Sequence, residues 1–298
     1  MSLSARRAMQ VLDFLTVNER GTFTLSELSK ALDVSPGSMF AVLKVMSDGG
    51  YVIRHPRHKT YTLGPAVAAV GHAASGAHPV IDLARAEMTS LAASTGHECS
   101  GTVMVGKDIL CIAVEGKPTG RQLELAPGQR IPLQPPFGQP FMAWMAPAEL
   151  RDRIMEMPVD LRARVDDYLR SYGPAVRRRG YTVGLEDPSP ERRSLTQDLA
   201  ERPNDAGLRE TLLGKFFDDQ PNYAVLEVDS DIEYDVGNIA APVFDPDGRV
   251  AFCLTLLHLG TLHGNEIAAA AQPVTASAQL LTRKISGRAP THDWNETL

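Results

Sequence analysis

Apolar residues recur every three or four positions in three stretches of the first 64 residues. This spacing predicts amphipathic helices over residues 4–17, 25–32 and 36–48. Ser4 is placed to cap the first helix, because its side-chain oxygen can accept from a free amide of the first turn. Pro36 lies in the first turn of the third helix, where its missing N–H costs nothing. The pattern therefore predicts a small helical N-terminal domain.

Two short β-prone segments, residues 51–53 and 61–63, follow these helices and flank a polar loop, His55–Lys59. Helix, short turn, helix and basic hairpin in this order predict a winged helix-turn-helix. Its second helix would enter the major groove of DNA, and the hairpin tip would reach a phosphate or the minor groove. The expected DNA contacts are Arg6, Arg7, Ser35, Ser38, Met39, Phe40, Lys44, Arg54, Arg57, His58 and Lys59.

The remaining residues predict a second, α+β domain of sensor-like layout. We expect the DNA-binding domain to cover residues 1–64, an Ala-rich linker helix residues 65–78 and the second domain residues 79–287. Residues 186–222 are rich in charge, Pro, Asn and Gly and are interpreted as a surface insertion. Residues 288–298 are interpreted as a flexible tail.

Within the second domain the pattern predicts an antiparallel sheet flanked by helices. The expected strands and extended pieces are 98–105, 109–114, 121–125, 130–133, 180–183, 223–228, 239–244 and 250–258, and a closing helix covers 264–285. Arg177–Arg179 are interpreted as a solvated C-terminal turn, where cations complement the helix dipole. Trp144 and Met145 are interpreted as core residues.

The charge of the chain is unevenly distributed. The total is −6, yet residues 1–64 contain eight Lys and Arg against five Asp and Glu. A basic N-terminal module on an acidic body is typical of a DNA reader joined to a domain that does not contact DNA. Chance remains the alternative explanation for so small an excess.

Several other function classes find no support in the sequence. The three cysteines, Cys99, Cys111 and Cys253, lie far apart, which fits a reducing cytoplasm and excludes a disulfide framework. No apolar run is long enough for a transmembrane helix, and the N-terminus lacks the features of a secretion signal. His55 and His58 lie in the hairpin loop and are not interpreted as metal ligands. We find no catalytic motif, no metal spacing and no phosphate-binding glycine loop, so we expect no enzyme activity and no cofactor.

Beyond these local patterns, the chain resembles the IclR-type bacterial transcriptional regulators along nearly its whole length. The resemblance rests on several segments in a fixed order. They are Arg6–Leu15, the helix-turn-helix, Gly49-Gly50-Tyr51, Tyr61–Gly64, Pro132-Leu133, Gly138, Arg179–Tyr181, Ile239–Asp245 and Gly248–Val250.

The resemblance implies a winged-helix DNA reader, a linker helix and a GAF-like effector domain. Such proteins are homodimers or dimers of dimers on pseudo-palindromic double-stranded operators, and they respond to small organic acids. In the recognition helix this chain departs from the family at Pro36 and Ala41, where basic or polar residues are usual. DNA affinity is therefore expected to depend more on the wing and on Arg6 and Arg7.

In the effector domain the resemblance implies a ligand pocket at positions that match the family motifs. The backbone at Phe137 and Gly138 matches the amides that the family presents to a carboxylate. Asn238 stands where the family has a pocket cysteine, and Leu257 where it has a hydroxyl. The larger apolar share favours an aromatic or partly apolar acid over a two- or three-carbon acid. The expected effector contacts are Phe137, Gly138, Gln139, Asp229, Asn238, Thr255 and Leu257.

One alternative function remains open at this point. The chain could be a small-molecule-binding or enzymatic GAF-like protein whose DNA-binding module is vestigial. The sequence decides neither between repression and activation nor which acid is sensed.

Overall fold

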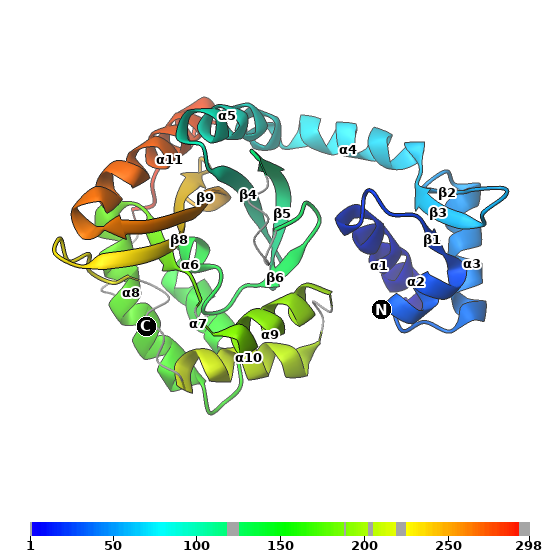
Figure 1. Cartoon of the computed structure of the whole chain (residues 1–298), viewed down its shortest axis with the longest axis horizontal. Helices are drawn as coiled ribbons and strands as arrows, with labels where there is room; N and C mark the ends of the chain where they lie inside the picture. The colour runs from blue at the N-terminus through cyan, green and yellow to red at the C-terminus, as the bar shows by residue number, and fades with distance from the viewer. Residues whose placement is uncertain (1, 118–124, 188, 202–204, 219–224, 292–298) are drawn as a thin grey trace. The chain divides into compact units, whose positions relative to one another are not determined.

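The computed structural model describes residues 2–117, 125–187, 189–201, 205–218 and 225–291 (Figure 1). The chain divides into two compact units. Met1–Pro79 and Ala126–Gln129 form the first, and Val80–Leu125 and Arg130–Leu298 form the second.

The first unit contains four helices and a small sheet among its described residues. In chain order these are α1 (Leu3–Val17), β1 (Phe23–Thr24), α2 (Leu25–Ala31), α3 (Pro36–Asp48), β2 (Val52–Arg54), β3 (Thr60–Leu63) and α4 (Pro65–Ala77). The strands form an antiparallel sheet in the order β1-β3-β2. The predicted winged helix-turn-helix is confirmed.

The core of this unit comes from the predicted apolar faces. Val11 of α1, Leu28 of α2 and Met39 and Leu43 of α3 are fully buried in one cluster. The predicted cap of the first helix is wrong, because Ser2 occupies the N-cap position and accepts from the amide of Ala5. The helix begins at Leu3, before the first residue of its apolar face, and the Leu3 side chain is about half exposed.

The second unit contains a six-stranded sheet and seven helices among its described residues. In chain order these are α5 (Pro79–Thr95), β4 (Glu98–Val105), β5 (Asp108–Glu115), β6 (Arg130–Pro132), α6 (Gln139–Met142), α7 (Pro147–Met155), α8 (Arg162–Arg179), β7 (Thr182–Leu185), α9 (Pro190–Glu201), α10 (Ala206–Asp218), β8 (Glu233–Phe244), β9 (Val250–His263) and α11 (Gly264–Lys284).

The strands of this sheet are antiparallel throughout and follow the order β6-β5-β4-β9-β8-β7. The central strands β4 and β9 pair with Ser100 opposite Thr255 and Thr102 opposite Cys253. Because side chains alternate along a strand, residues of opposite parity enter opposite layers. Ile239 packs in the cluster with α5 and α11, whereas Ala240 packs in the cluster with α6, α7 and α8.

Helices therefore cover both faces of the sheet (Figure 1). On one face, α5 contributes Met88 and α11 contributes Ile267 and Leu281 to the larger core cluster. On the other face, Phe141 and Met142 of α6 pack with Leu169 of α8. The α+β class with an antiparallel sheet and flanking helices is confirmed, and the layout is consistent with the GAF-like domain that the resemblance implies.

The segment predicted as a surface insertion forms part of the domain. Its described residues include α9 and α10, whose Leu199, Leu212, Leu213 and Phe216 are buried. Leu213 belongs to the cluster between the helices and the sheet. The apolar side chains of α9 and α10 therefore pack into the domain, so the described part of this segment is not confined to the surface.

One further prediction differs from the structure, and two others lie largely outside the described residues. Val225–Val228 form no strand, although the Val225 amide donates to the Val183 carbonyl. The extended piece over 121–125 falls mostly, and the tail over 288–298 largely, outside the described residues.

The arginine run at the end of α8 is also not the solvated turn that was predicted. The Arg177 Nη1 donates to the Ala143 carbonyl at 2.6 Å, and burial lowers the pKa of Arg177 to about 10. Burial also lowers the pKa of Arg179. Both side chains fold back over the protein, and Arg178 alone of the three is exposed. Trp144 and Met145 are buried as predicted.

Candidate functional sites

The helix-turn-helix is shaped by local sequence signals. Thr24 and Glu27 form a capping box, in which the Glu27 amide donates to Thr24 Oγ1 and the Thr24 amide donates to Glu27 Oε2. These hydrogen bonds lower the pKa of the Glu27 carboxyl. Asp33 takes a left-handed conformation with φ of 49°, which turns the chain into α3. The recognition helix therefore starts at Ser35–Pro36.

The structure exposes most of the predicted DNA contacts of this helix. Ser35 and Lys44 are exposed, and Phe40 is 56% exposed although it is a large apolar residue. Ser38 is half-buried, and its hydroxyl accepts from Ser35 Oγ at 3.0 Å. Met39 corrects the prediction, because its side chain is fully buried in the core and cannot face DNA.

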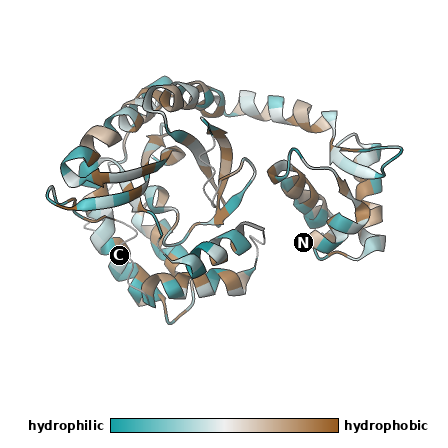
Figure 2. Cartoon of the chain, in the orientation of Figure 1, coloured by the Kyte–Doolittle hydropathy of each residue, from teal (hydrophilic) through white to brown (hydrophobic). Residues whose placement is uncertain are grey.

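The wing is the hairpin between β2 and β3, with hydrophilic residues at its tip (Figure 2). His55 Nδ1 accepts from the amides of Arg57 and His58, which fixes the tight turn. Arg54, Arg57, His58 and Lys59 are all exposed. The wing therefore presents a cluster of cationic side chains on a defined backbone, which suits phosphate contacts.

Arg6 and Arg7 lie in the first two turns of α1, where Arg6 is exposed and Arg7 half-buried. The first turn of α1 contains no acidic residue. Cations at a helix N-terminus oppose the helix dipole, so a bound anion would stabilise them there.

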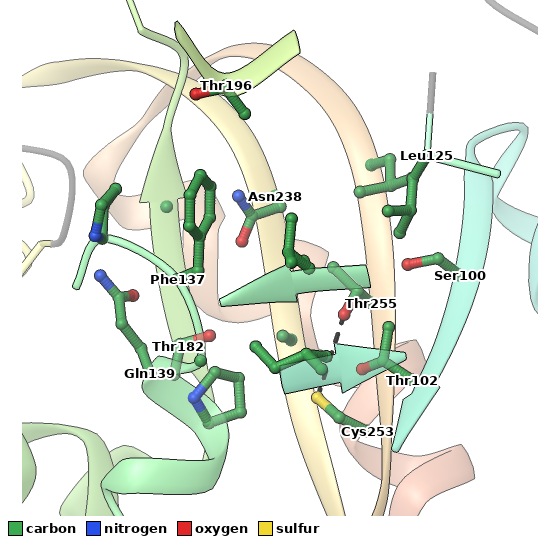
Figure 3. A pocket seen from close by; sticks show the side chains of 18 of the residues that line it. Ser100, Thr102, Leu125, Phe137, Gln139, Thr182, Thr196, Asn238, Cys253 and Thr255 are labelled. Carbon is green, nitrogen blue, oxygen red and sulfur yellow. Dashed lines mark hydrogen bonds between the residues drawn. The ribbon is translucent and has the colours of Figure 1, made fainter. Parts of the chain in front are cut away.

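A pocket of about 280 Å³ lies in the second unit, on the face of the sheet that α6 covers (Figure 3). Strands β4, β7, β8 and β9, the loop before α6 and helix α9 all contribute to its walls. Its polar lining residues are Ser100, Thr102, Gln139, Thr182, Glu186, Asp187, Arg193, Thr196, Asn238, Cys253 and Thr255, and its apolar ones include Ile109, Leu125, Ile131, Phe137, Phe141, Leu185 and Leu257. A pocket of this kind suits a small molecule with both an apolar and a polar part.

The structure brings six of the seven predicted effector contacts together in this pocket, namely Phe137, Gly138, Gln139, Asn238, Thr255 and Leu257. Gly138 has φ of 72°, and a side chain there would meet the Leu133 side chain at 2.4 Å, so the turn requires glycine. The Phe137 amide already donates to the Gln134 carbonyl at 2.7 Å. The Phe137 amide is therefore not available to a ligand, whereas the resemblance implied that it would bind a carboxylate.

Asp229 corrects the prediction, because it lies outside the pocket. It is exposed in a turn, where its Oδ1 accepts from the Asp231 amide at 2.9 Å. The acidic residues that line the pocket are instead Glu186 and Asp187. The pairing of β7 with β8 sets Gly184 opposite Asn238, and Glu186 follows β7, with its amide donating to the Asp235 carbonyl at 2.9 Å.

Both acidic residues have basic partners. Asp187 forms a two-pronged ion pair with Arg192, in which Nη2 and Nε donate to Oδ1 and Oδ2 at 2.8 and 3.1 Å. Glu186 Oε1 lies 3.1 Å from His258 Nδ1. These pairs join the pocket rim to α9 and β9.

Comparison with known proteins shows which regulators the chain resembles. Residues 4–56 match the IclR helix-turn-helix domain. The N-terminal domain is therefore an IclR-type helix-turn-helix, and the chain is similar to IclR transcriptional regulators. It is 27% identical over 194 residues to the HTH-type transcriptional regulator XynR of Escherichia coli (strain K12), a match that covers 62% of this chain and 75% of XynR. It is 22% identical over 210 residues to the HTH-type transcriptional regulator BhcR of Paracoccus denitrificans (strain Pd 1222), covering 67% of this chain and 73% of BhcR.

Solved IclR structures share the fold. An IclR transcriptional regulator from Alicyclobacillus acidocaldarius superposes with a TM-score of 0.64 at 20% identity, covering 95% of this chain and 98% of that one. An IclR homologue from Microbacterium hydrocarbonoxydans, solved with 4-hydroxybenzoate, gives a TM-score of 0.60 at 14% identity, covering 94% and 98%.

The prediction from sequence missed Glu186, Asp187, Arg193 and Thr196 as pocket residues. All four lie in the segment that was interpreted as an insertion. A usable signal was Ser189-Pro190, which predicts a helix start. Arg193 and Thr196 are then three positions apart and share one helix face.

Metal binding and membrane insertion find no support in the described residues. No group of three or more His, Cys, Asp or Glu side chains there is arranged to hold a metal ion. Among the same residues, no helix is both long and apolar enough to span a membrane.

Proposed function

We propose that this IclR regulator binds a pseudo-palindromic double-stranded operator and that a small organic acid in the pocket changes its affinity for that operator. The observation that carries the proposal is the pocket itself. It lies in the unit that follows an IclR-type DNA-binding domain, and its lining combines apolar side chains with hydroxyls, an amide and charges.

The proposed DNA contacts divide by chemistry. Arg6, Arg7, Arg54, Arg57, His58 and Lys59 would neutralise phosphates, which supply most of the affinity and none of the sequence information. Ser35, Ser38, Phe40 and Lys44 would meet base edges from the recognition helix. The exposed Phe40 ring is placed for apolar contact with a thymine methyl group, a contact that can discriminate between base pairs.

The proposed effector is an aromatic or partly apolar acid. Phe137 and Leu257 give the pocket apolar walls, and Asn238 and Thr255 offer hydrogen bonds. The Microbacterium homologue was solved with 4-hydroxybenzoate, which supports an aromatic acid for this chain by analogy alone.

The proposed assembly is a homodimer or a dimer of dimers. The 13-residue helix α4 has no buried side chain within the described chain, so it could pack against a second copy. Two-fold symmetry of the protein would match a pseudo-palindromic operator with half-sites about one helical turn apart.

The experiment is fluorescence anisotropy with DNA from upstream of the protein's own gene and a scrambled duplex of equal length. We expect tighter binding to the native sequence. Arg57→Ala with Lys59→Ala should weaken binding to both duplexes and lower the salt slope by roughly one for each phosphate that is no longer neutralised. Arg20→Ala, which removes an exposed cation at the end of α1, is the matched control. If no sequence-specific DNA is found, the alternative of a ligand-binding protein with a vestigial DNA module is favoured.

A further inference from the structure

Arg193 is the cationic side chain that α9 contributes to the lining of the pocket. It is half-buried, and its Nη1 donates to the backbone carbonyl of Asp187. This bond fixes the guanidinium at the pocket wall but leaves most of its five donors for other acceptors.

The acidic residues of the same pocket do not neutralise Arg193. Asp187 is paired with Arg192, whose side chain is only 6% exposed, and Glu186 is paired with His258. Among the residues that the structure describes, no carboxylate lies within ion-pair distance of Arg193. A half-buried cation without a counter-ion is costly, and an anionic ligand would remove that cost.

The backbone around Arg193 is held in place before any ligand binds. Asp187 Oδ1 accepts from the Ser189 amide at 2.8 Å, and Ser189 Oγ accepts from the Arg192 amide at 3.3 Å. The start of α9 is therefore anchored to the end of β7. One turn along α9, Thr196 lies across the pocket from Thr102 and Cys253 (Figure 3). The Thr196 hydroxyl donates to the Arg192 carbonyl at 2.9 Å, so the donors that α9 can offer a ligand on this wall come from Arg193.

We propose that Arg193 binds the carboxylate of the effector and that the pocket selects monocarboxylates with an apolar body. The carboxylate matches the guanidinium in shape and charge, and Ile109, Phe137 and Leu257 line the remaining space. Among the lining residues that the structure describes, Arg193 is the one Lys or Arg, so a second carboxylate would lose its hydration without gaining a cationic partner. This inference depends on the proposed function of the pocket as the effector site.

The position of the anchor differs from the one that the IclR resemblance implied. The loop before α6 offers fewer free amides than expected, because the Phe137 amide is already bonded. The charge that could hold an acid comes instead from α9. The ligand would then link α9 to the sheet.

The test is isothermal titration calorimetry on the full chain with four probes. They are 4-hydroxybenzoate, cyclohexanecarboxylate, the neutral 4-hydroxybenzamide and the dicarboxylate terephthalate. We expect at least one of the two monocarboxylates to bind, and to bind at least about tenfold more tightly than the amide and than terephthalate. Arg193→Gln should bind the monocarboxylate at least about tenfold more weakly than the unmodified chain does, and it should no longer prefer the acid over the amide. Arg193→Lys should keep part of the affinity and part of the preference.

Arg178→Gln is the matched control, because it removes the same charge from an exposed site that pairs only with an exposed Glu227. It should bind all probes like the unmodified chain. The inference is overturned if neither monocarboxylate binds, or if Arg193→Gln keeps its preference for the acid over the amide. The readout does not involve DNA, so a failure of operator binding would count against the proposed function and not against the role of Arg193.

Discussion

At the scale of single residues, Gln139 connects the pocket to the helix layer behind it. Its Nε2 donates to the Tyr168 hydroxyl at 2.9 Å, and its Oε1 accepts from the Tyr172 hydroxyl at 2.8 Å. All three residues are buried or nearly so, and burial raises the pKa of both phenols. The Gln139 side chain therefore fixes the positions of both tyrosine hydroxyls.

We predict that Gln139→Leu lowers the free energy of unfolding by about 1–3 kcal/mol, because it leaves buried hydroxyls without their partner. Urea denaturation measures the change. Gln272→Leu on the exposed side of α11 is the control and should stay within about 0.5 kcal/mol. Equal stability of the two variants would show that the tyrosines do not depend on Gln139.

The three thiols give a second prediction at this scale. Burial raises the pKa of Cys99, Cys111 and Cys253 to about 12, above the value of roughly 8.5 for a free thiol. The folded chain therefore keeps neutral thiols that are poor nucleophiles.

A thiol-specific chromogenic reagent at pH 8 should react slowly with the native protein and quickly with all three thiols in denaturant. The unfolded thiols lose protons above roughly pH 8.5 while the folded ones retain them until about pH 12. The three thiols should not change the free energy of unfolding below roughly pH 8.5. That free energy should fall as the pH rises from there toward about 12. Fast reaction of a native thiol would contradict the burial.

At the scale of elements, the N-terminal unit could be predicted from sequence because its signals are local. The apolar faces of α1, α2 and α3 and the glycines before β2 mark each element in place. The pocket could be predicted only in part, because its residues are brought together by pairing between strands that are far apart in the sequence. The register of β7 with β8 brings Gly184 opposite Asn238 and leaves Glu186 and Asp187 at the rim, and no local pattern encodes this register.

The packing of helix α9 also could not be predicted from local sequence patterns, and its buried ion pair gives a testable prediction. Its composition is polar, yet the ion pair between Arg192 and Asp187 is nearly buried, with 6% and 15% of the side chains exposed. Arg192→Ala would remove the guanidinium that pairs with the nearly buried Asp187 carboxylate, and we expect a loss of about 3–5 kcal/mol in unfolding free energy. Hydrogen exchange should increase in α9. Arg178→Ala is the control at an exposed ion pair, and similar effects of both substitutions would contradict the anchoring of α9.

At the scale of the whole molecule, the chain contains two units with separate cores. Met39 is fully buried in the first and Leu254 in the second. Met39→Ala should cost about 2–5 kcal/mol in the DNA-binding unit and leave affinity for a pocket ligand unchanged. Leu254→Ala should weaken ligand binding. It should also lower the midpoint temperature of the unfolding transition that the ligand stabilises. One shared transition that responds equally to both substitutions would contradict the independence of the cores.

The central claim is that occupancy of the pocket changes DNA binding. The direct measurement is operator affinity by fluorescence anisotropy, with and without a saturating amount of the tightest-binding monocarboxylate, for the unmodified chain and Arg193→Gln. We predict a change of about fivefold or more for the unmodified chain. Arg193→Gln should bind the operator equally well without the acid and show no response at the same acid concentration. An operator affinity that is the same with the pocket filled and empty would contradict the account.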